Sequence, residues 1–186
     1  AVGAPNSTTT AANDGAVWVF YGSSAGLSAT AATKITGSAT ATAYFGNAVA
    51  RSNVNGDAYD DLVIGEYGYS SETGRVWVYA GSSAGIATGT FRTLSPPTAG
   101  SGASNTGSRY GWAVSGGRSV TSDIYQEVAV GQPYYSTSSS AANYNGRVTV
   151  YTGASTFFTV TPTASTPITG TLGYRYGSAV NLEGSY

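Results

Sequence analysis

The 186-residue sequence contains no cysteine, no histidine and no methionine, and charged residues make up only 9% of it. Histidine is the commonest general base and transition-metal ligand in proteins, so its absence weighs against acid–base catalysis and against a transition-metal site. A Ser-His-Asp triad and a Cys-His pair are both impossible within this chain. We therefore do not expect the chain to be an enzyme.

Charge of either sign is scarce and balanced, with eight basic and nine acidic residues and a net charge of −1. No stripe of lysine or arginine is present to neutralise phosphates, which argues against nucleic-acid binding. No apolar run approaches the roughly 20 residues that a membrane-spanning helix needs. Lysine is scarce while serine and threonine are abundant. We therefore expect a secreted or cell-surface protein.

Glycine, with 26 residues, and tyrosine, with 15, are abundant. The glycines mark three landmarks that recur at intervals of roughly 65 residues. The landmarks are an aromatic-Gly step, an apolar run that ends in glycine, and a Gly-led alternating strand. The aromatic-Gly steps begin at Phe45, Tyr110 and Tyr176, the apolar runs end at Gly3, Gly65 and Gly131, and the Gly-led strands begin at Gly15, Gly74 and Gly146.

Each landmark has the composition of a β-strand. Val, Ile, Trp, Tyr and Thr recur with a period of two, which suits a pleated, half-buried sheet. Clusters of Gly, Asn, Ser and Pro separate the runs, as hairpin turns require. No stretch keeps a helical period. We predict an all-β fold made of β-propeller blades of about four antiparallel strands each, with roughly three blades in this chain.

The whole chain, 1–186, is predicted to be one propeller segment. Its units lie near 1–44, 45–109 and 110–175, and another begins at 176–186. Each unit ends in a variable segment that we expect to hold the outer strand of its blade. These segments are 28–41, 87–108 and 156–172. Because a propeller usually has four to eight blades, we expect either a longer ring that contains these blades or a ring closed by several copies of the chain.

A loop rich in oxygen side chains separates the first two landmarks of the middle unit. From Asn53 to Asp61 it places oxygen side chains at its first, third, fifth and ninth positions. Calcium takes six to eight oxygen ligands from a flexible loop, and Gly56 permits a left-handed turn. We predict a Ca²⁺ site. Its ligands would be the side chains of Asn53, Asn55, Asp57 and Asp61 and the carbonyl of Tyr59. The alternative is an Asx-rich turn that bonds only its own backbone amides.

The loop begins like an EF-hand, but its twelfth position is Ile64 instead of Glu and no helical pattern flanks it. With Phe45-Gly46 before it and the apolar run to Gly65 after it, the segment resembles an FG-GAP repeat, as in the integrin α-subunit propeller and many bacterial surface proteins. The resemblance implies a β-propeller with calcium in hairpin loops on one face. Asn53 stands where that pattern prefers Asp, and Ala58 where it prefers Gly, which implies weaker calcium binding.

The equivalent loop of the next unit is a weaker candidate for a metal site, because hydroxyls are poorer ligands than carboxylates and Arg118 lies beside it. Its candidate ligands are Ser119, Thr121, Asp123 and Glu127, with the carbonyl of Tyr125.

Four tyrosines follow the apolar-Gly runs and are candidates for ligand binding, because tyrosine offers a large contact area with a polar tip. They are Tyr67, Tyr69, Tyr134 and Tyr135. Alternatively, these four tyrosines only cover neighbouring loops. Trp18 and Trp77 occupy matching strand positions and are predicted to lie in the core between blades, and Arg75 and Arg147 are predicted to be structural.

These features favour an extracellular calcium-binding module for adhesion or for recognition of a protein or glycan. Two alternatives remain. One is a structural subunit of a surface assembly or oligomeric ring, whose open blade edges pair with further copies of the chain. The other is a non-catalytic accessory propeller of a secreted enzyme, an arrangement similar to that of glycosylphosphatidylinositol-specific phospholipase D.

Overall fold

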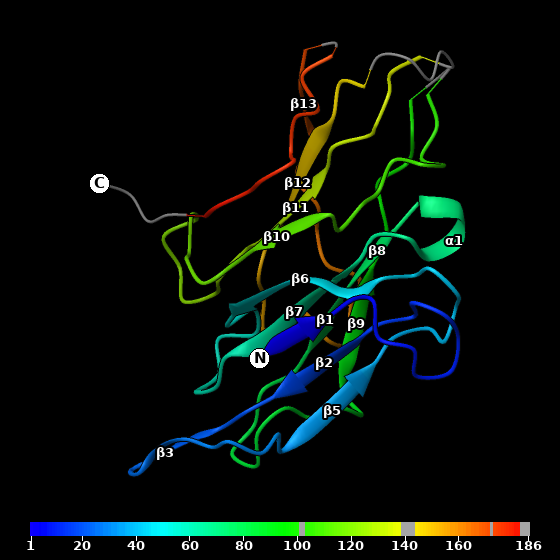
Figure 1. Ribbon diagram of the computed structural model, residues 1–186. Coiled ribbons are helices and arrows are strands. Elements are labelled where there is room, and N and C mark those ends of the chain that lie inside the picture. The colour runs from blue at the N-terminus through cyan, green and yellow to red at the C-terminus, as the bar shows by residue number, and fades with distance from the viewer. Residues whose placement is uncertain (101–102, 139–143, 172, 183–186) are drawn as a thin grey trace.

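The computed structural model describes residues 1–100, 103–138, 144–171 and 173–182, and its regular structure is almost entirely β-strand (Figure 1). The helical element α1 (Tyr69–Glu72) is a single turn in which Ser70 and Ser71 have left-handed φ values of 52° and 55°. Among the described residues, no helix is long and apolar enough to cross a lipid bilayer. The predicted all-β fold is confirmed.

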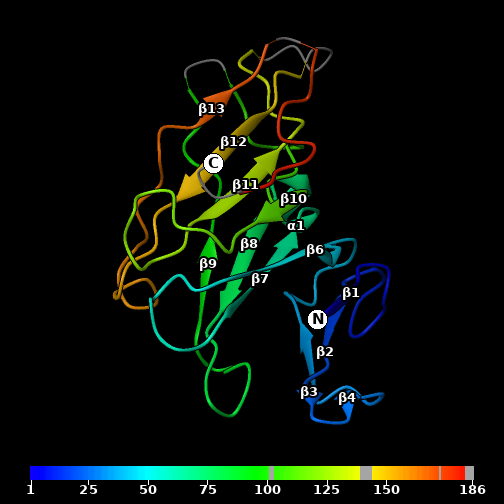
Figure 2. The ribbon, with the colours of Figure 1, turned by 90° about the vertical axis from the view of Figure 1, so that its left-hand side faces the viewer.

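Three antiparallel sheets follow one another along the chain, and we call them the first, middle and last blade (Figure 1, Figure 2). The first blade consists of β1 (Val2–Ala4), β2 (Ala16–Val19) and β5 (Thr33–Thr36), with a small hairpin of β3 (Gly22–Ser23) and β4 (Gly26–Leu27). The middle blade consists of β6 (Phe45–Ser52), β7 (Asp61–Glu66), β8 (Arg75–Tyr79) and β9 (Phe91–Leu94). The last blade consists of β10 (Ala113–Ser115), β11 (Val128–Gln132), β12 (Arg147–Tyr151) and β13 (Ile168–Thr169).

In all three blades the outermost strand lies in the variable segment that was predicted to hold it. These strands are β5, β9 and β13, and each pairs antiparallel with the Gly-led strand before it. The further unit predicted at 176–186 is described as far as residue 182, and 183–186 lie outside the described residues.

The recurring glycines lie where consecutive units touch. A Cβ atom on Gly65 would lie 2.1 Å from the carbonyl oxygen of Gly111, so glycine alone permits this approach of two backbones. The matching pairs are Gly3 with Gly46 and Gly131 with Gly177, at 2.0 Å each. The Gly-led strands form a second contact, because Gly15, Gly74 and Gly146 each form a parallel bridge with the aromatic residue of the next unit. The sequence repeat therefore records contacts between neighbouring units.

Apolar side chains form one core in each of the two gaps between blades. Because side chains alternate along a strand, the central strands β7 and β8 contribute to both cores. The core between the first and middle blades contains Val17, Ile35, Phe45, Ile64 and Tyr79. The core between the middle and last blades contains Val63, Val76, Val78, Tyr110, Val130 and Phe157.

The two strand tryptophans lie in different environments. Trp77 packs against the core between the first and middle blades, and its Nε1 donates a 2.6 Å hydrogen bond to Glu66. Trp18 has the matching position, but it shares a face of the first blade with Val2 and Lys34, and this face points away from the middle blade. The predicted core position is confirmed for Trp77. In the described part of the chain, both other blades lie on the opposite side of the first blade from Trp18.

Arg147 makes a polar contact with the preceding unit, and Arg75 binds Glu66, which makes such a contact; both arginines therefore have the predicted structural role. Arg75 Nε donates to Glu66 Oε2 at 2.6 Å, and the N–H of Ser38, from the first unit, donates to Glu66 Oε1 at 3.0 Å. In the last blade Arg147 donates from Nη2 to the carbonyl of Pro97 at 2.8 Å.

Candidate functional site

The predicted metal loop connects β6 to β7 and is built around Asp57. Asp57 Oδ1 accepts a hydrogen bond from the N–H of Tyr59 at 2.7 Å, and the N–H of Asp57 donates to Asn55 Oδ1 at 3.2 Å. Asn53 Nδ2 donates to the carbonyl of Asp57 at 2.6 Å, and Gly56 has a left-handed φ of 71°. The turn therefore brings Asn53, Asn55 and Asp57 together, as predicted from their spacing.

Asp61 is the first residue of β7, and its side chain is buried. Its Oδ2 accepts a hydrogen bond from the N–H of Val54 at 2.8 Å, and its Oδ1 accepts one from the N–H of Gly81 at 2.9 Å. Burial, with a smaller contribution from the charges of Asp57 and Asp60, raises the pKa of Asp61 to about 6 in spite of these two hydrogen bonds. A carboxylate in this environment is one whose charge a bound cation would stabilise.

Asn53 Oδ1 is buried and has no hydrogen-bond partner among the described residues. A buried polar atom without a partner costs about 1–3 kcal/mol, so this oxygen fits the position of a metal ligand. The donors gathered here are hard oxygens from amides and carboxylates, which is the set that calcium prefers. The loop therefore fits a calcium ion chemically.

Neutral oxygens would dominate such a site. The described residues contain no group of three or more His, Cys, Asp or Glu side chains placed to hold a metal. Asp60, the remaining carboxylate of the loop, forms an ion pair with Arg51 at 2.7 Å. A low count of carboxylates is expected to weaken calcium binding.

The second loop, which the structure describes in full, repeats this architecture, but no buried side-chain oxygen in it lacks a hydrogen-bond partner, whereas Asn53 Oδ1 in the first loop does. The N–H of Tyr125 donates to Asp123 Oδ1 at 2.9 Å, and the N–H of Val120 donates to Glu127 Oε2 at 2.6 Å. These bonds match those of Asp57 and Asp61 in the first loop. Thr121 Oγ1 also donates to Glu127, at 3.1 Å, and Ser119 Oγ donates to Asp123, at 3.2 Å. The four side chains predicted as ligands are therefore gathered, and, as in the first loop, each of them has a hydrogen-bond partner.

The two loops pack against each other. The N–H of Gln126 donates to the carbonyl of Asn53 at 2.9 Å, and the N–H of Asn53 donates to the side-chain oxygen of Gln126 at 2.8 Å. The ring of Tyr125 lies against Gly56, where a Cβ atom would approach it to 2.7 Å. The backbone of the first loop is therefore supported by the second.

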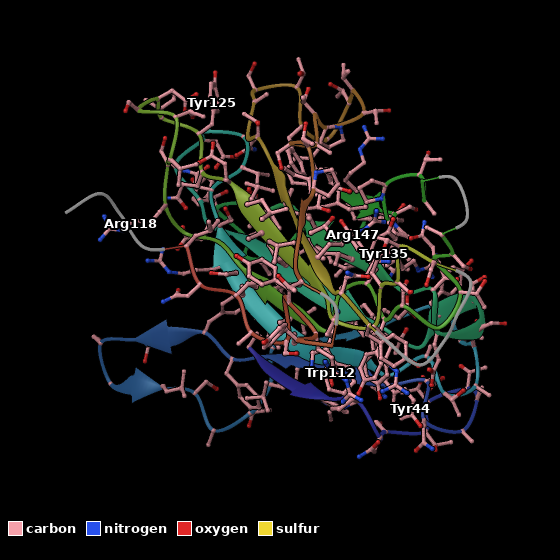
Figure 3. All side chains as sticks on the ribbon, turned by 90° about the horizontal axis from the view of Figure 1, so that it is seen from above. Tyr44, Trp112, Arg118, Tyr125, Tyr135 and Arg147 are labelled. Carbon is pink, nitrogen blue, oxygen red and sulfur yellow. The ribbon has the colours of Figure 1, made fainter. Side chains whose placement is uncertain are left out.

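A row of aromatic rings lies at the other end of the blades, and Figure 3 shows Tyr44 and Tyr125 at opposite edges of the molecule. Tyr44 stacks on Tyr67 with ring centroids 4.9 Å apart, and Tyr67 lies 4.8 Å from Trp112. Trp112 lies 5.9 Å from Tyr134, which lies 5.0 Å from Tyr144. We call these five residues the aromatic row. Each of them is half-buried, so each ring also reaches the surface.

Two of the four candidate tyrosines belong to the aromatic row, and two do not. Tyr135 is buried, and the guanidinium of Arg147 lies 3.9 Å from its ring centroid, so its ring is not free to bind a ligand. Tyr69 is covered by the guanidinium of Arg75 at 3.6 Å. Sequence reasoning missed Tyr44, Trp112 and Tyr144 as neighbours of Tyr67 and Tyr134. Tyr44 and Trp112 flank the aromatic-Gly steps, and this placement was the signal that could have found them.

A scan against protein families matches residues 45–79 to the FG-GAP repeat, from the start of β6 to the end of β8. The middle blade carries an FG-GAP repeat. No curated protein matches the chain. The FG-GAP repeat contains the whole first loop and all five ligands predicted there, whereas the second loop lies outside the matched residues.

Proposed function

We propose that this chain is a calcium-binding β-propeller module that works outside the cell in adhesion or recognition of a protein or glycan, without catalysis of its own. The observation that carries the proposal is the buried, unpartnered Oδ1 of Asn53 within a turn of amide and carboxylate oxygens. Asn53, Asn55, Asp57 and Asp61 would hold the ion through their side chains, and Tyr59 through its carbonyl. Bound calcium would attract the carboxylates of Asp57, in the loop, and of Asp61, the first residue of β7, and would so hold the loop against β7.

The placement of the acidic side chains supports a non-catalytic role. Asp14 is buried and accepts hydrogen bonds from the backbone of residues 9–11. Glu66 is bound by Arg75 and Trp77, and Glu127 closes the second loop. These carboxylates therefore serve the fold. The half-buried rings of the aromatic row offer a contact surface suited to a protein or a glycan.

The proposal is tested by thermal unfolding in calcium and in EGTA. At a calcium concentration of about 100 times Kd, binding adds about 2.7 kcal/mol, which corresponds to a rise in Tm of about 5–10 °C for a chain of this size. Asp57→Ala should abolish the rise. Asp123→Ala is the matched control, because Asp123 makes the same backbone hydrogen bond in the second loop, and this variant should keep the rise. Equal melting of the wild type in calcium and in EGTA would refute the calcium site.

A specific observation also favours assembly with further blades. The first blade has three strands where the other two have four, and Val2 on its outward face is 57% exposed beside Trp18 and Lys34. We propose that another blade, from the same polypeptide or from a second copy, covers this face. Size-exclusion chromatography with light scattering tests whether a second copy of the chain supplies this blade. A stable multimer that Trp18→Glu dissociates supports closure by copies of the chain, and a wild-type monomer excludes it.

A further inference from the structure

A hollow of about 450 Å³ lies beside the first loop, where a turn of the middle unit meets residues of the first unit and of the loop. Its walls are Tyr21, Tyr59, Asp60 and the turn 81–86. Small-molecule sites in proteins commonly measure about 300–1,000 Å³, so the space suits one or two small rings.

The walls of the hollow are held by contacts within the protein. The hydroxyl of Tyr21 accepts a hydrogen bond from the N–H of Ile86 at 2.7 Å, which joins the first unit to the turn. Ser82 Oγ donates to the carbonyl of Gly85 at 2.7 Å and closes the turn itself. The N–H of Gly81 donates to Asp61 Oδ1 at 2.9 Å, so the turn is also attached to the end of the candidate calcium loop. Tyr21 and the turn 81–86 are therefore held in place without a bound sugar.

The hollow presents an aromatic ring beside a carboxylate whose ion-pair partner, Arg51, lies outside its walls. Tyr59 is 41% exposed. Asp60 forms its 2.7 Å ion pair with Arg51, and both side chains stay open to solvent at 48% and 68% exposure. A ring face suits apolar C–H groups, and a carboxylate accepts hydrogen bonds from hydroxyls.

We infer that this hollow binds a neutral sugar residue of a glycan. A sugar ring has an apolar C–H face for Tyr59 and adjacent hydroxyls for the carboxylate of Asp60. Asp60 is the charged residue of the walls, and its ion pair with Arg51 outside the hollow neutralises it, so no net charge there selects an anionic or a cationic ligand. The inference rests on the proposed recognition function and gives it a ligand class and a site distinct from the aromatic row.

The site would also respond to calcium, because its two walls are attached to the candidate calcium loop. Tyr59 and Asp60 are residues of that loop, and Gly81 is bonded to Asp61. Ordering of the loop by calcium would fix the position of Tyr59 relative to the turn. Removal of calcium should therefore weaken sugar binding without any direct contact between metal and sugar.

The test is an array of neutral and acidic glycans, followed by saturation-transfer NMR with the neutral glycans that bind. Wild type in calcium should bind at least one neutral glycan, and EGTA should weaken that binding. Tyr59→Ala and Asp60→Ala should each weaken it at least about tenfold. Tyr174→Ala is the matched control, because Tyr174 is 77% exposed and belongs to the last unit, and this variant should bind as wild type does.

The outcomes separate this inference from the function on which it rests. If Tyr67→Ala abolishes glycan binding while Tyr59→Ala leaves it intact, the sugar binds at the aromatic row and the inference is wrong, although the recognition function stands. If no neutral glycan binds in calcium, the inference is also wrong. The calcium-dependent rise in Tm, measured on the same samples, tests the metal site independently of sugar binding.

Discussion

Gly65→Ala tests whether the close backbone contact between units holds the blades together. A Cβ atom at position 65 would lie 2.1 Å from the carbonyl oxygen of Gly111, whereas ordinary contacts begin at 3.4 Å. The two backbones would have to separate by about 1.3 Å. No flexible side chain is available to give way, because the opposing atom belongs to the backbone of glycine.

The expected cost follows from two opposing terms. Overpacking of a tightly packed interior costs about 1–3 kcal/mol, and the rigidity of both backbones places this contact toward the upper end of the range. Replacing glycine by alanine lowers the entropy of the unfolded chain and so stabilises the folded protein by about 0.4–1 kcal/mol. We expect a net loss of about 2 kcal/mol, which lowers Tm by about 4–8 °C in a chain of this length.

The assay is urea unfolding followed by tyrosine and tryptophan fluorescence, with Gly89→Ala as the control. A Cβ atom on Gly89 would meet nothing within 4 Å, and the backbone there is not left-handed. Its effect should stay within about 0.5 kcal/mol. Equal stability of the two variants would refute the idea that the recurring glycines are required by contacts between units.

Three further outcomes are expected. Hydrogen bonds from the backbone and side chain of residues 9–11 hold the pKa of Asp14 well below its usual range despite its burial, so stability should fall as pH drops below about 4, where the unfolded chain takes up a proton first. Asp14→Asn should flatten that fall in acid unfolding curves, and an unchanged slope would contradict it. Glu66→Ala leaves the partly buried Arg75 without its partner and should cost about 3–5 kcal/mol of stability. Glu72→Ala breaks the more exposed pair with Arg109 and should cost less than about 1 kcal/mol. Similar losses of stability in urea unfolding would contradict the stabilising role of the buried Arg75–Glu66 pair. Tyr110→Phe removes a buried 2.8 Å hydrogen bond to Tyr151, whose hydroxyl still donates to the carbonyl of Ser95, and should cost about 1 kcal/mol; a loss above about 3 kcal/mol would mean that Tyr151 is left unsatisfied.

The sequence by itself determined the class of fold and the composition of the first loop. The continuous apolar run of β7, the alternation in β8 and the glycines that recur every ~65 residues carry that information locally. The positions of Asn53, Asn55 and Asp57 are equally local, because side chains two residues apart in a tight turn meet whatever the rest of the chain does. The outer strands, such as β9, were also placed correctly by the order of landmarks.

Tertiary structure decided which of the similar residues are exposed. Tyr134 and Tyr135 are neighbours in sequence, yet Tyr135 is buried under Arg147 while Tyr134 joins the aromatic row. Trp77 and Trp18 share a strand position, but the described chain places a neighbouring blade over Trp77 alone. The hollow beside Tyr59 depends on a hydrogen bond between Tyr21 and Ile86, which are 65 residues apart. Such contacts depend on how one blade packs on the next, and a pattern within a single strand contains no information about that packing.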